Sequence, residues 1–172
     1  MDPYAPESWH DFFLAAAGAA AALTGLLFVA LSLHIRYIAA DRRYRNMARG
    51  SLIGLVMVLI LSLIALVHEP AWLTGIELAA ISALYLLLEG GYELSTFRRA
   101  RWQLPRATYV SSGIGQLLAL AGIVGGLSLV FQAGPGLYII AFISIVIVVW
   151  NLWDAWVLLM GVADEEIELE AH

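Results

Sequence analysis

Long apolar stretches separated by short polar turns dominate the pattern of the chain. Five of them are long enough for a transmembrane helix, which needs about 17–25 residues. They cover residues 12–35, 51–67, 71–88, 107–131 and 136–160. None alternates strictly between apolar and polar residues as a barrel strand does, and inside a bilayer only helices or closed barrels satisfy the backbone hydrogen bonds. The pattern predicts an all-α membrane protein with five transmembrane helices.

The composition agrees with this fold class. Of the 172 residues, 62% are hydrophobic and 13% are charged, whereas an average soluble domain carries about 25% charged residues. A soluble globular domain is therefore excluded, and the absence of cysteine excludes a disulfide framework. The five helices and their connections fill residues 1–163, which we expect to form one domain, and residues 164–172 form an acidic tail.

The basic residues indicate how the helices are oriented. All nine are arginines, and they lie in two connections, at Arg36, Arg42, Arg43, Arg45 and Arg49, and at Arg98, Arg99, Arg101 and Arg106. Five crossings place both connections on one face of the membrane, which the positive-inside rule makes cytoplasmic. We expect the N-terminus outside, the C-terminus inside, and anionic lipid headgroups at the arginine loops. This charge pattern follows from the topology and indicates no nucleic-acid partner.

Small residues recur at three- and four-residue spacing, which lets membrane helices approach closely. The stripes are Ala15, Gly18, Ala22, Gly25, Val29 and Ser32 in the first helix, Gly50 and Gly54 in the second, Gly75, Ala79 and Ser82 in the third, and Ser112, Gly115, Ala119, Gly122 and Gly126 in the fourth. These are more small-residue faces than one compact bundle needs. We therefore expect a homo-oligomer.

The last apolar stretch carries the candidate site. Ser144, Asn151 and Asp154 share one helical face, while Trp150, Trp153 and Trp156 lie on the other. Polar groups at membrane depth point into a bundle, and tryptophan prefers the interface with water. We expect the first set to face inward and the tryptophans to face lipid.

Two roles remain open for Asp154. A carboxylate in this position either pairs with an arginine, for which the candidates are Arg36, Arg49 and Arg106, or it handles a proton or cation. Other polar residues extend a possible path, and they are Gln116, Glu89 and Glu93. The two glutamates also fit a salt-bridge collar beside the arginine loop.

A metal site is a weaker alternative. His10, His68, Glu69 and Glu77 are expected near one membrane surface, and such side chains bind divalent ions. No pair has the spacing of a metal motif such as HExxH, so we expect ordinary interfacial side chains and no cofactor.

The motifs of covalent and nucleotide chemistry are absent as well. The sequence contains no GxSxG, no Walker loop and no cysteine, so we do not expect an enzyme. The best-supported function is an oligomeric channel- or transporter-like protein with a polar path at Asn151 and Asp154. The alternative is a non-catalytic structural or regulatory membrane protein that binds lipid or a partner membrane protein.

The first helix and the residues before it carry a resemblance. The run Trp9-His10-Asp11-Phe12-Phe13, followed by Gly18 and the segment Ala19 to Ser32 (AAAALTGLLFVALS), resembles a family of small bacterial integral-membrane proteins. The resemblance implies a multi-pass protein of the bacterial plasma membrane. It assigns no functional residue.

Overall fold

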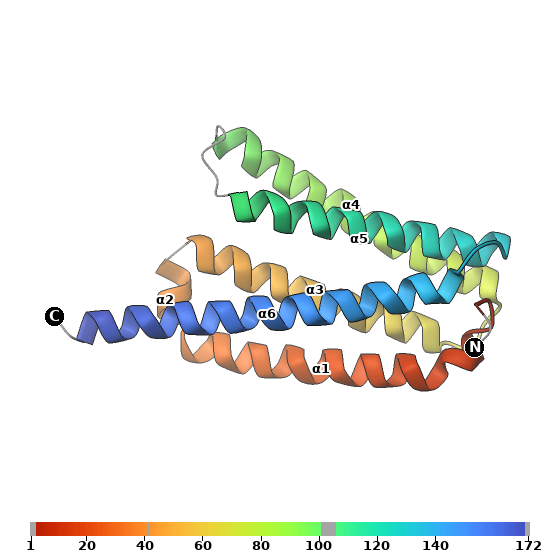
Figure 1. The fold of residues 1–172 in the computed structure, drawn as a ribbon, viewed down its shortest axis with the longest axis horizontal. Helices are drawn as coiled ribbons and strands as arrows, with labels where there is room; N and C mark the ends of the chain where they lie inside the picture. The colour runs from red at the N-terminus through yellow and green to blue at the C-terminus, as the bar shows by residue number, and fades with distance from the viewer. Residues whose placement is uncertain (1–2, 41, 101–105, 171–172) are drawn as a thin grey trace. The chain divides into compact units, whose positions relative to one another are not determined.

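A computed structural model describes residues 3–40, 42–100 and 106–170, with side chains at 3–36, 38–40, 44–92, 113–157 and 160. Every regular element in this part of the chain is helical (Figure 1). In chain order they are the 3₁₀ turn η1 (Pro6–Trp9), α1 (His10–Leu33), α2 (Ile35–Ala40), α3 (Arg42–Leu66), α4 (Ala71–Ala100), α5 (Arg106–Phe131) and α6 (Gly136–Glu170).

Within the described residues, five helices are long and apolar enough to cross a membrane, which confirms the predicted number. The apolar segments are Pro6–Leu33, Tyr44–Leu66, Ala71–Tyr92, Gly113–Phe131 and Gly136–Val157. The last helix has 35 residues, so at 1.5 Å per residue it is about 52 Å long and exceeds a hydrocarbon core of about 30 Å. The backbone of the acidic segment 164–170 therefore continues α6.

The chain divides into two compact units, which we describe separately. The hairpin unit comprises Met1–Asp11 and Ile64–Ile143, and the three-helix unit comprises Phe12–Leu63 and Ser144–His172. The first contains α4 and α5. The second contains most of α1, α3 and α6, together with α2.

In the hairpin unit, two of the predicted small-residue stripes pack against each other. A Cβ atom added at Gly126 would lie 2.6 Å from both the Ala79 nitrogen and the Gly75 oxygen, and one added at Gly122 would lie 2.5 Å from the Ser82 Oγ. The backbones of α4 and α5 therefore approach as closely as their glycines allow, as small residues permit inside lipid.

The residues before α1 form a strap over the start of α6, within the hairpin unit. The backbone nitrogen of Leu137 donates a hydrogen bond of 3.2 Å to the Pro3 oxygen. The Trp9 ring meets the Tyr138 ring edge-on, with centroids 4.6 Å apart. Because the first amides of a helix have no partner within the helix, the strap supplies an acceptor for one of them.

Polar contacts also define the turn between α5 and α6. Gly134 has φ +93°, a conformation that suits glycine, and its oxygen accepts a 2.7 Å hydrogen bond from the Tyr4 hydroxyl. The Ser128 hydroxyl donates to the Ala133 oxygen at 2.6 Å and accepts from the Gly136 nitrogen at 2.9 Å. One buried serine thus links the end of α5 to the start of α6.

The core of the three-helix unit is built mainly from large apolar side chains. It contains Leu27, Leu31, Ile38, Tyr44, Ala48 and Leu55. The small-residue stripe of α1, from Ala15 to Ser32, is exposed instead, and an added Cβ would meet nothing within 4 Å at Gly18 or Gly25. The stripe is therefore not a packing face in the described chain. The face that α1 buries is a different one, formed by Phe13, Ala17, Ala20, Leu27 and Leu31.

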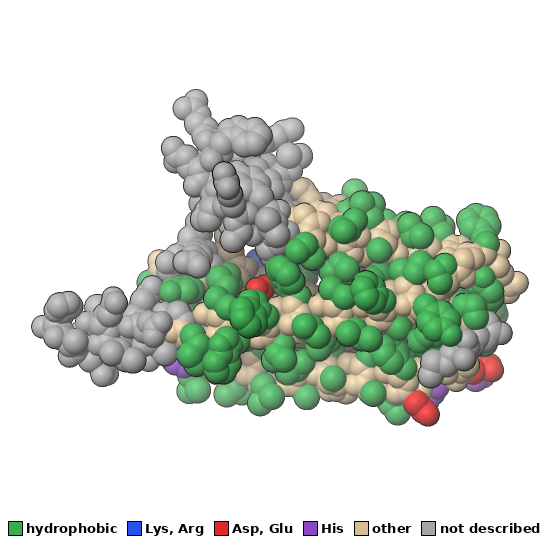
Figure 2. All heavy atoms as spheres, in the orientation of Figure 1, with side chains coloured by type: hydrophobic (Ala, Val, Ile, Leu, Met, Phe, Trp, Pro, Cys, Tyr) green, Lys and Arg blue, Asp and Glu red, His purple; other side chains and the backbone are tan. Residues whose placement is uncertain are grey.

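The exposed surface is largely apolar. Figure 2 shows hydrophobic side chains spread over the visible face, and exposed positions include Leu26, Phe28, Leu87 and Phe131, at 64–74% of their full exposure. A soluble protein rarely leaves such large apolar patches in water. The surface thus fits a multi-pass membrane protein.

Candidate functional site

The three-helix unit buries polar side chains on two helices, α3 and α6. Ser51 and Ser62 of α3 are 1% and 0% exposed, and Ser144 and Asn151 of α6 are 1% and 6% exposed. Together with the half-buried Asp154, these residues form what we call the polar seam. The seam lies inside two apolar segments, where each polar group is costly without a partner.

Asn151 marks the point where the two helices touch. A Cβ added at Gly54 would lie 2.8 Å from its Oδ1 and 2.9 Å from its Cγ, so the amide covers the glycine. Its Nδ2 donates a 2.7 Å hydrogen bond to the Ile147 oxygen one turn earlier. Gly50, the other member of the predicted pair, has open space around it.

The two faces of α6 largely follow the prediction. Ser144 and Asn151 are buried, whereas Trp153 and Trp156 are 65% and 58% exposed. The exception is Trp150, which is half-buried. Its indole lies one helical turn before the Asp154 carboxylate and interacts with it, as residues four apart on a helix can.

The structure thus places the Trp150 indole beside the Asp154 carboxylate. Two of its predicted arginine partners are described: Arg36 is exposed on α2, and Arg49 is half-buried on α3. The side chain of Arg106 lies outside the described residues. The pairing with an arginine stays a prediction.

Ser51, Ser62 and Gly54 were not among the predicted site residues. A signal was present, because Tyr44, Ala48, Ser51, Leu55, Val58, Ser62 and Ala65 follow one another at three- and four-residue steps and are all buried. Two serines thus occupy core positions of a heptad-like stripe. Average hydropathy does not distinguish such serines from exposed ones.

The other predicted path residues lie in the hairpin unit. A Cβ added at Gly90 would lie 3.4 Å from the Oε1 of Gln116, which brings Gln116 close to the α4 backbone beside the half-buried Glu89. The side chain of Glu93 lies outside the described residues. Gln116 and Glu89 therefore both belong to the α4–α5 hairpin, which is described apart from the seam.

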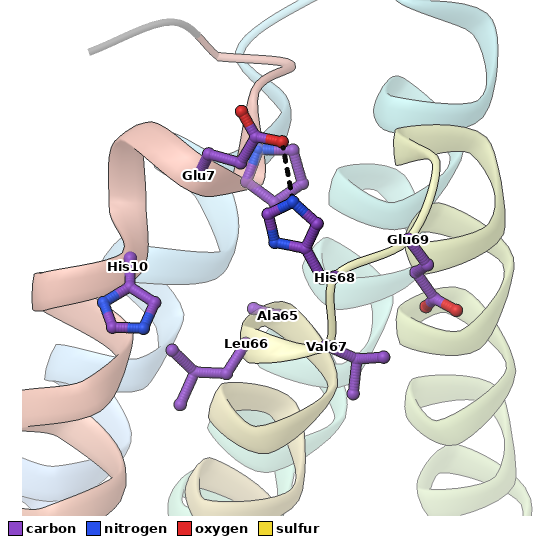
Figure 3. Close-up of a pocket in the computed structure, with 8 residues that line it drawn as sticks. Glu7, His10, Ala65, Leu66, Val67, His68 and Glu69 are labelled. Atoms are coloured by element: carbon purple, nitrogen blue, oxygen red, sulfur yellow. Dashed lines mark ion pairs between the residues drawn. The ribbon is translucent and has the colours of Figure 1, made fainter.

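A second polar group lies at the turn between α3 and α4 (Figure 3). The Nε2 of His68 lies 3.3 Å from the Oε1 of Glu7, and the Nδ1 of His10 lies 3.4 Å from the Oδ1 of Asp11. Glu7, His10 and His68 border a cavity of about 30 Å³, which is enough for one or two water molecules and far below the size of an organic ligand.

These side chains do not converge on one point. In Figure 3 Glu69 points away from the pair formed by Glu7 and His68. Within the described residues, no three histidine, aspartate or glutamate side chains are placed to hold a metal ion. The alternative metal site at His10, His68, Glu69 and Glu77 thus gains no support.

Glu69 is the titratable group of this turn with a clearly perturbed environment. Its Oε1 is buried without a hydrogen-bond partner in the described structure. Partial burial and the nearby Glu77 carboxylate raise the pKa of Glu69 above its ordinary value of 4.5. Both causes penalise the charged form.

We expect Glu69→Gln to remove a pH dependence of stability. Above pH 4.5 the folded protein holds this proton more tightly than the unfolded chain, so the free energy of unfolding falls as pH rises through the raised pKa. In detergent, thermal unfolding of Glu69→Gln should give a higher Tm than wild type at pH 7 and an equal Tm at pH 4. Asp11→Asn, at a fully exposed carboxylate, is the control and should match wild type at both values. An equal shift of the Glu69→Gln variant at both pH values would contradict the explanation.

No family model, curated protein or solved structure matches the chain. Chemically, the seam offers hydroxyls, one amide and one carboxylate. Such groups can bind or pass on a proton or a small cation.

Proposed function

We propose that the protein carries a small cation across the membrane along the polar seam, with Asn151 and Asp154 as its central residues. The observation that supports this proposal is the burial of Ser51, Ser62, Ser144 and Asn151 on two neighbouring apolar helices. Polar and ionisable groups inside membrane segments are expensive and often mark ion or proton pathways. A purely structural helix pair would gain more from apolar side chains at these positions.

The charge of the seam favours a cation. Asp154 is its one ionisable member, and the Trp150 indole beside it is neutral. A carboxylate in a low-dielectric environment attracts cations or protons and repels anions.

The orientation and location belong to the same proposal. The nine arginines lie in the α1–α3 region and in the region joining α4 and α5. With both regions on the cytoplasmic face, the N-terminus is outside and the C-terminus inside a bacterial plasma membrane. The arginines then contact anionic headgroups.

The exposed small-residue stripe of α1 supports a homo-oligomer and also favours a second candidate function. Six residues from Ala15 to Ser32 are exposed along α1, and Gly18 and Gly25 have open space above them. A neighbouring membrane helix can approach such a face closely. The second candidate is therefore a non-catalytic membrane protein that binds lipid or a partner protein through α1.

Flux through reconstituted vesicles tests the proposal. We expect wild-type protein to carry a cation current driven by an imposed gradient and Asp154→Asn to lower it at least tenfold, because the substitution removes the one charge of the seam. Asp11→Asn, at an exposed carboxylate outside the seam, should conduct like wild type. Unchanged flux in the Asp154→Asn variant, with normal helix content, would overturn the proposal. A wild type that carries no cation at all would also overturn it and would favour the second candidate.

A further inference from the structure

Two hydroxyl groups of the seam differ from three other helical hydroxyls in the part of the chain that the structure describes. Thr24, Ser32 and Ser82 each donate a 2.7 Å hydrogen bond to the backbone oxygen four residues earlier. Ser51 and Ser62 are buried more deeply, yet within the described residues their Oγ atoms have no hydrogen-bond partner. A buried hydroxyl without a partner is costly, so these two groups are available to a hydrogen-bond partner outside their own helix.

The two hydroxyls lie at different levels of the seam. In Figure 1 α3 runs antiparallel to α6, and Gly54 meets Asn151. Ser51 lies three residues before Gly54 on α3, and Asp154 lies three residues after Asn151 on α6, so these two side chains lie at about the same level. On the other side of the contact, Ser62 lies eight residues after Gly54, at about the level of Ser144. At 1.5 Å per residue, Ser51 and Ser62 are about 16 Å apart along α3.

The groups available at each level suit a proton better than a metal cation. A metal cation needs several oxygen ligands at one place, whereas each level of the seam offers one or two polar side chains, and the Asn151 amide fills the space beside Gly54. A hydroxyl both donates and accepts hydrogen bonds. A hydroxyl can therefore accept a hydrogen bond from one water molecule and donate one to the next, which holds a chain of water molecules in place.

We propose that the transported cation is the proton and that Ser62 and Ser51 hold the water molecules along which it moves to and from Asp154. The inference rests on the proposed function. In each transfer, a serine hydroxyl accepts a hydrogen bond from one water and donates to the next. It receives one proton as it releases another and ends unchanged. At the end of the relay, the Asp154 carboxylate takes up one proton and returns it to water on the other side.

Proton flux in vesicles loaded with a pH-sensitive dye tests this relay. With a potassium diffusion potential as the driving force, Ser62→Ala and Ser51→Ala should each lower the proton flux at least fivefold, and Ser62→Thr should restore most of it. Ser82→Ala is the matched control. Ser82 is also buried, at 2% exposure, but its hydroxyl is already bonded to the Leu78 oxygen, so this variant should conduct like wild type. Thermal unfolding of each variant shows that the fold is retained.

The outcomes separate the relay from the proposed function. Normal proton flux in both serine variants, with loss of flux in Asp154→Asn, would overturn the relay and leave cation transport in place. Wild-type flux of sodium or potassium without proton flux would overturn the proton assignment alone. A wild type with no flux of any cation would overturn both. A drop in Ser82→Ala equal to that in Ser62→Ala would also contradict the relay, because any lost hydroxyl would then have the same effect.

Discussion

Gly126→Ala is expected to lower the free energy of unfolding of the hairpin unit by about 3 kcal/mol, the upper end of the usual cost of overpacking. The added Cβ would lie 2.6 Å from the Ala79 nitrogen and 2.6 Å from the Gly75 oxygen. Both are backbone atoms, so no side chain can rotate away, and α4 and α5 must move apart. The contacts between their small residues weaken with that separation, and these contacts hold membrane helices together.

The measurement is unfolding of purified protein in a mixed detergent titration, followed by tryptophan fluorescence. Gly113→Ala is the matched control, because Gly113 lies on the same helix and an added Cβ there meets nothing within 4 Å. That variant should be as stable as wild type or slightly more stable, since alanine favours a helix by up to about 1 kcal/mol over glycine. Equal stability of the two variants would show that the close approach of α4 and α5 is not required.

The helices themselves were predictable because hydropathy is a local property. A run of apolar residues such as 136–160 must form a helix in lipid whatever surrounds it. The ends were less predictable: the helix predicted to start at residue 51 begins at Arg42, and α4 and α6 extend to Ala100 and Glu170. Polar residues beyond the bilayer continue a helix without any hydropathy signal.

Which helices pair could not be derived from composition. The small-residue stripes of the first, third and fourth helices look alike in the sequence, yet Gly75 and Gly126 face each other while Gly18 and Gly25 face open space. The partner of a stripe depends on the arrangement of the helices in space. The strap contacts of Pro3 and Tyr4 likewise join residues more than a hundred positions apart, and no local sequence pattern predicts them.

The site was predictable only in part, because the sequence shows which face of a helix is polar but not which helix packs against that face. The helical wheel of α6 places Ser144 and Asn151 on the face that the structure buries. Ser51 and Ser62 on α3 were not predicted, because they belong to the seam only through the packing of α6 against α3. Gln116 and Glu89 share the polarity of the predicted path but belong to the α4–α5 hairpin.

Gly54 and Asn151 should behave as one energetic unit in a double-mutant cycle. An alanine Cβ at position 54 would lie 2.8 Å from the Asn151 Oδ1 and 2.9 Å from its Cγ. We therefore expect Gly54→Ala to cost about 2 kcal/mol by overpacking. Asn151→Ala alone should cost about 1 kcal/mol, since it removes the hydrogen bond to the Ile147 oxygen. In the double variant the two alanine methyl groups fit in the space of the amide, so its loss should be smaller than the sum of the single losses.

Unfolding titrations on the wild type, the two single variants and the double variant should give a coupling energy of about 1–2 kcal/mol. This value lies within the range of about 0.5–3 kcal/mol for residues in contact. Gly50→Ala supplies the control cycle: Gly50 is one turn away on α3 and has open space around it, so its effect should add to that of Asn151→Ala without coupling. Additive losses for Gly54→Ala and Asn151→Ala would show that the amide does not rest on the glycine. The seam would then lack the contact that sets the level of Ser51 against Asp154, on which the relay depends.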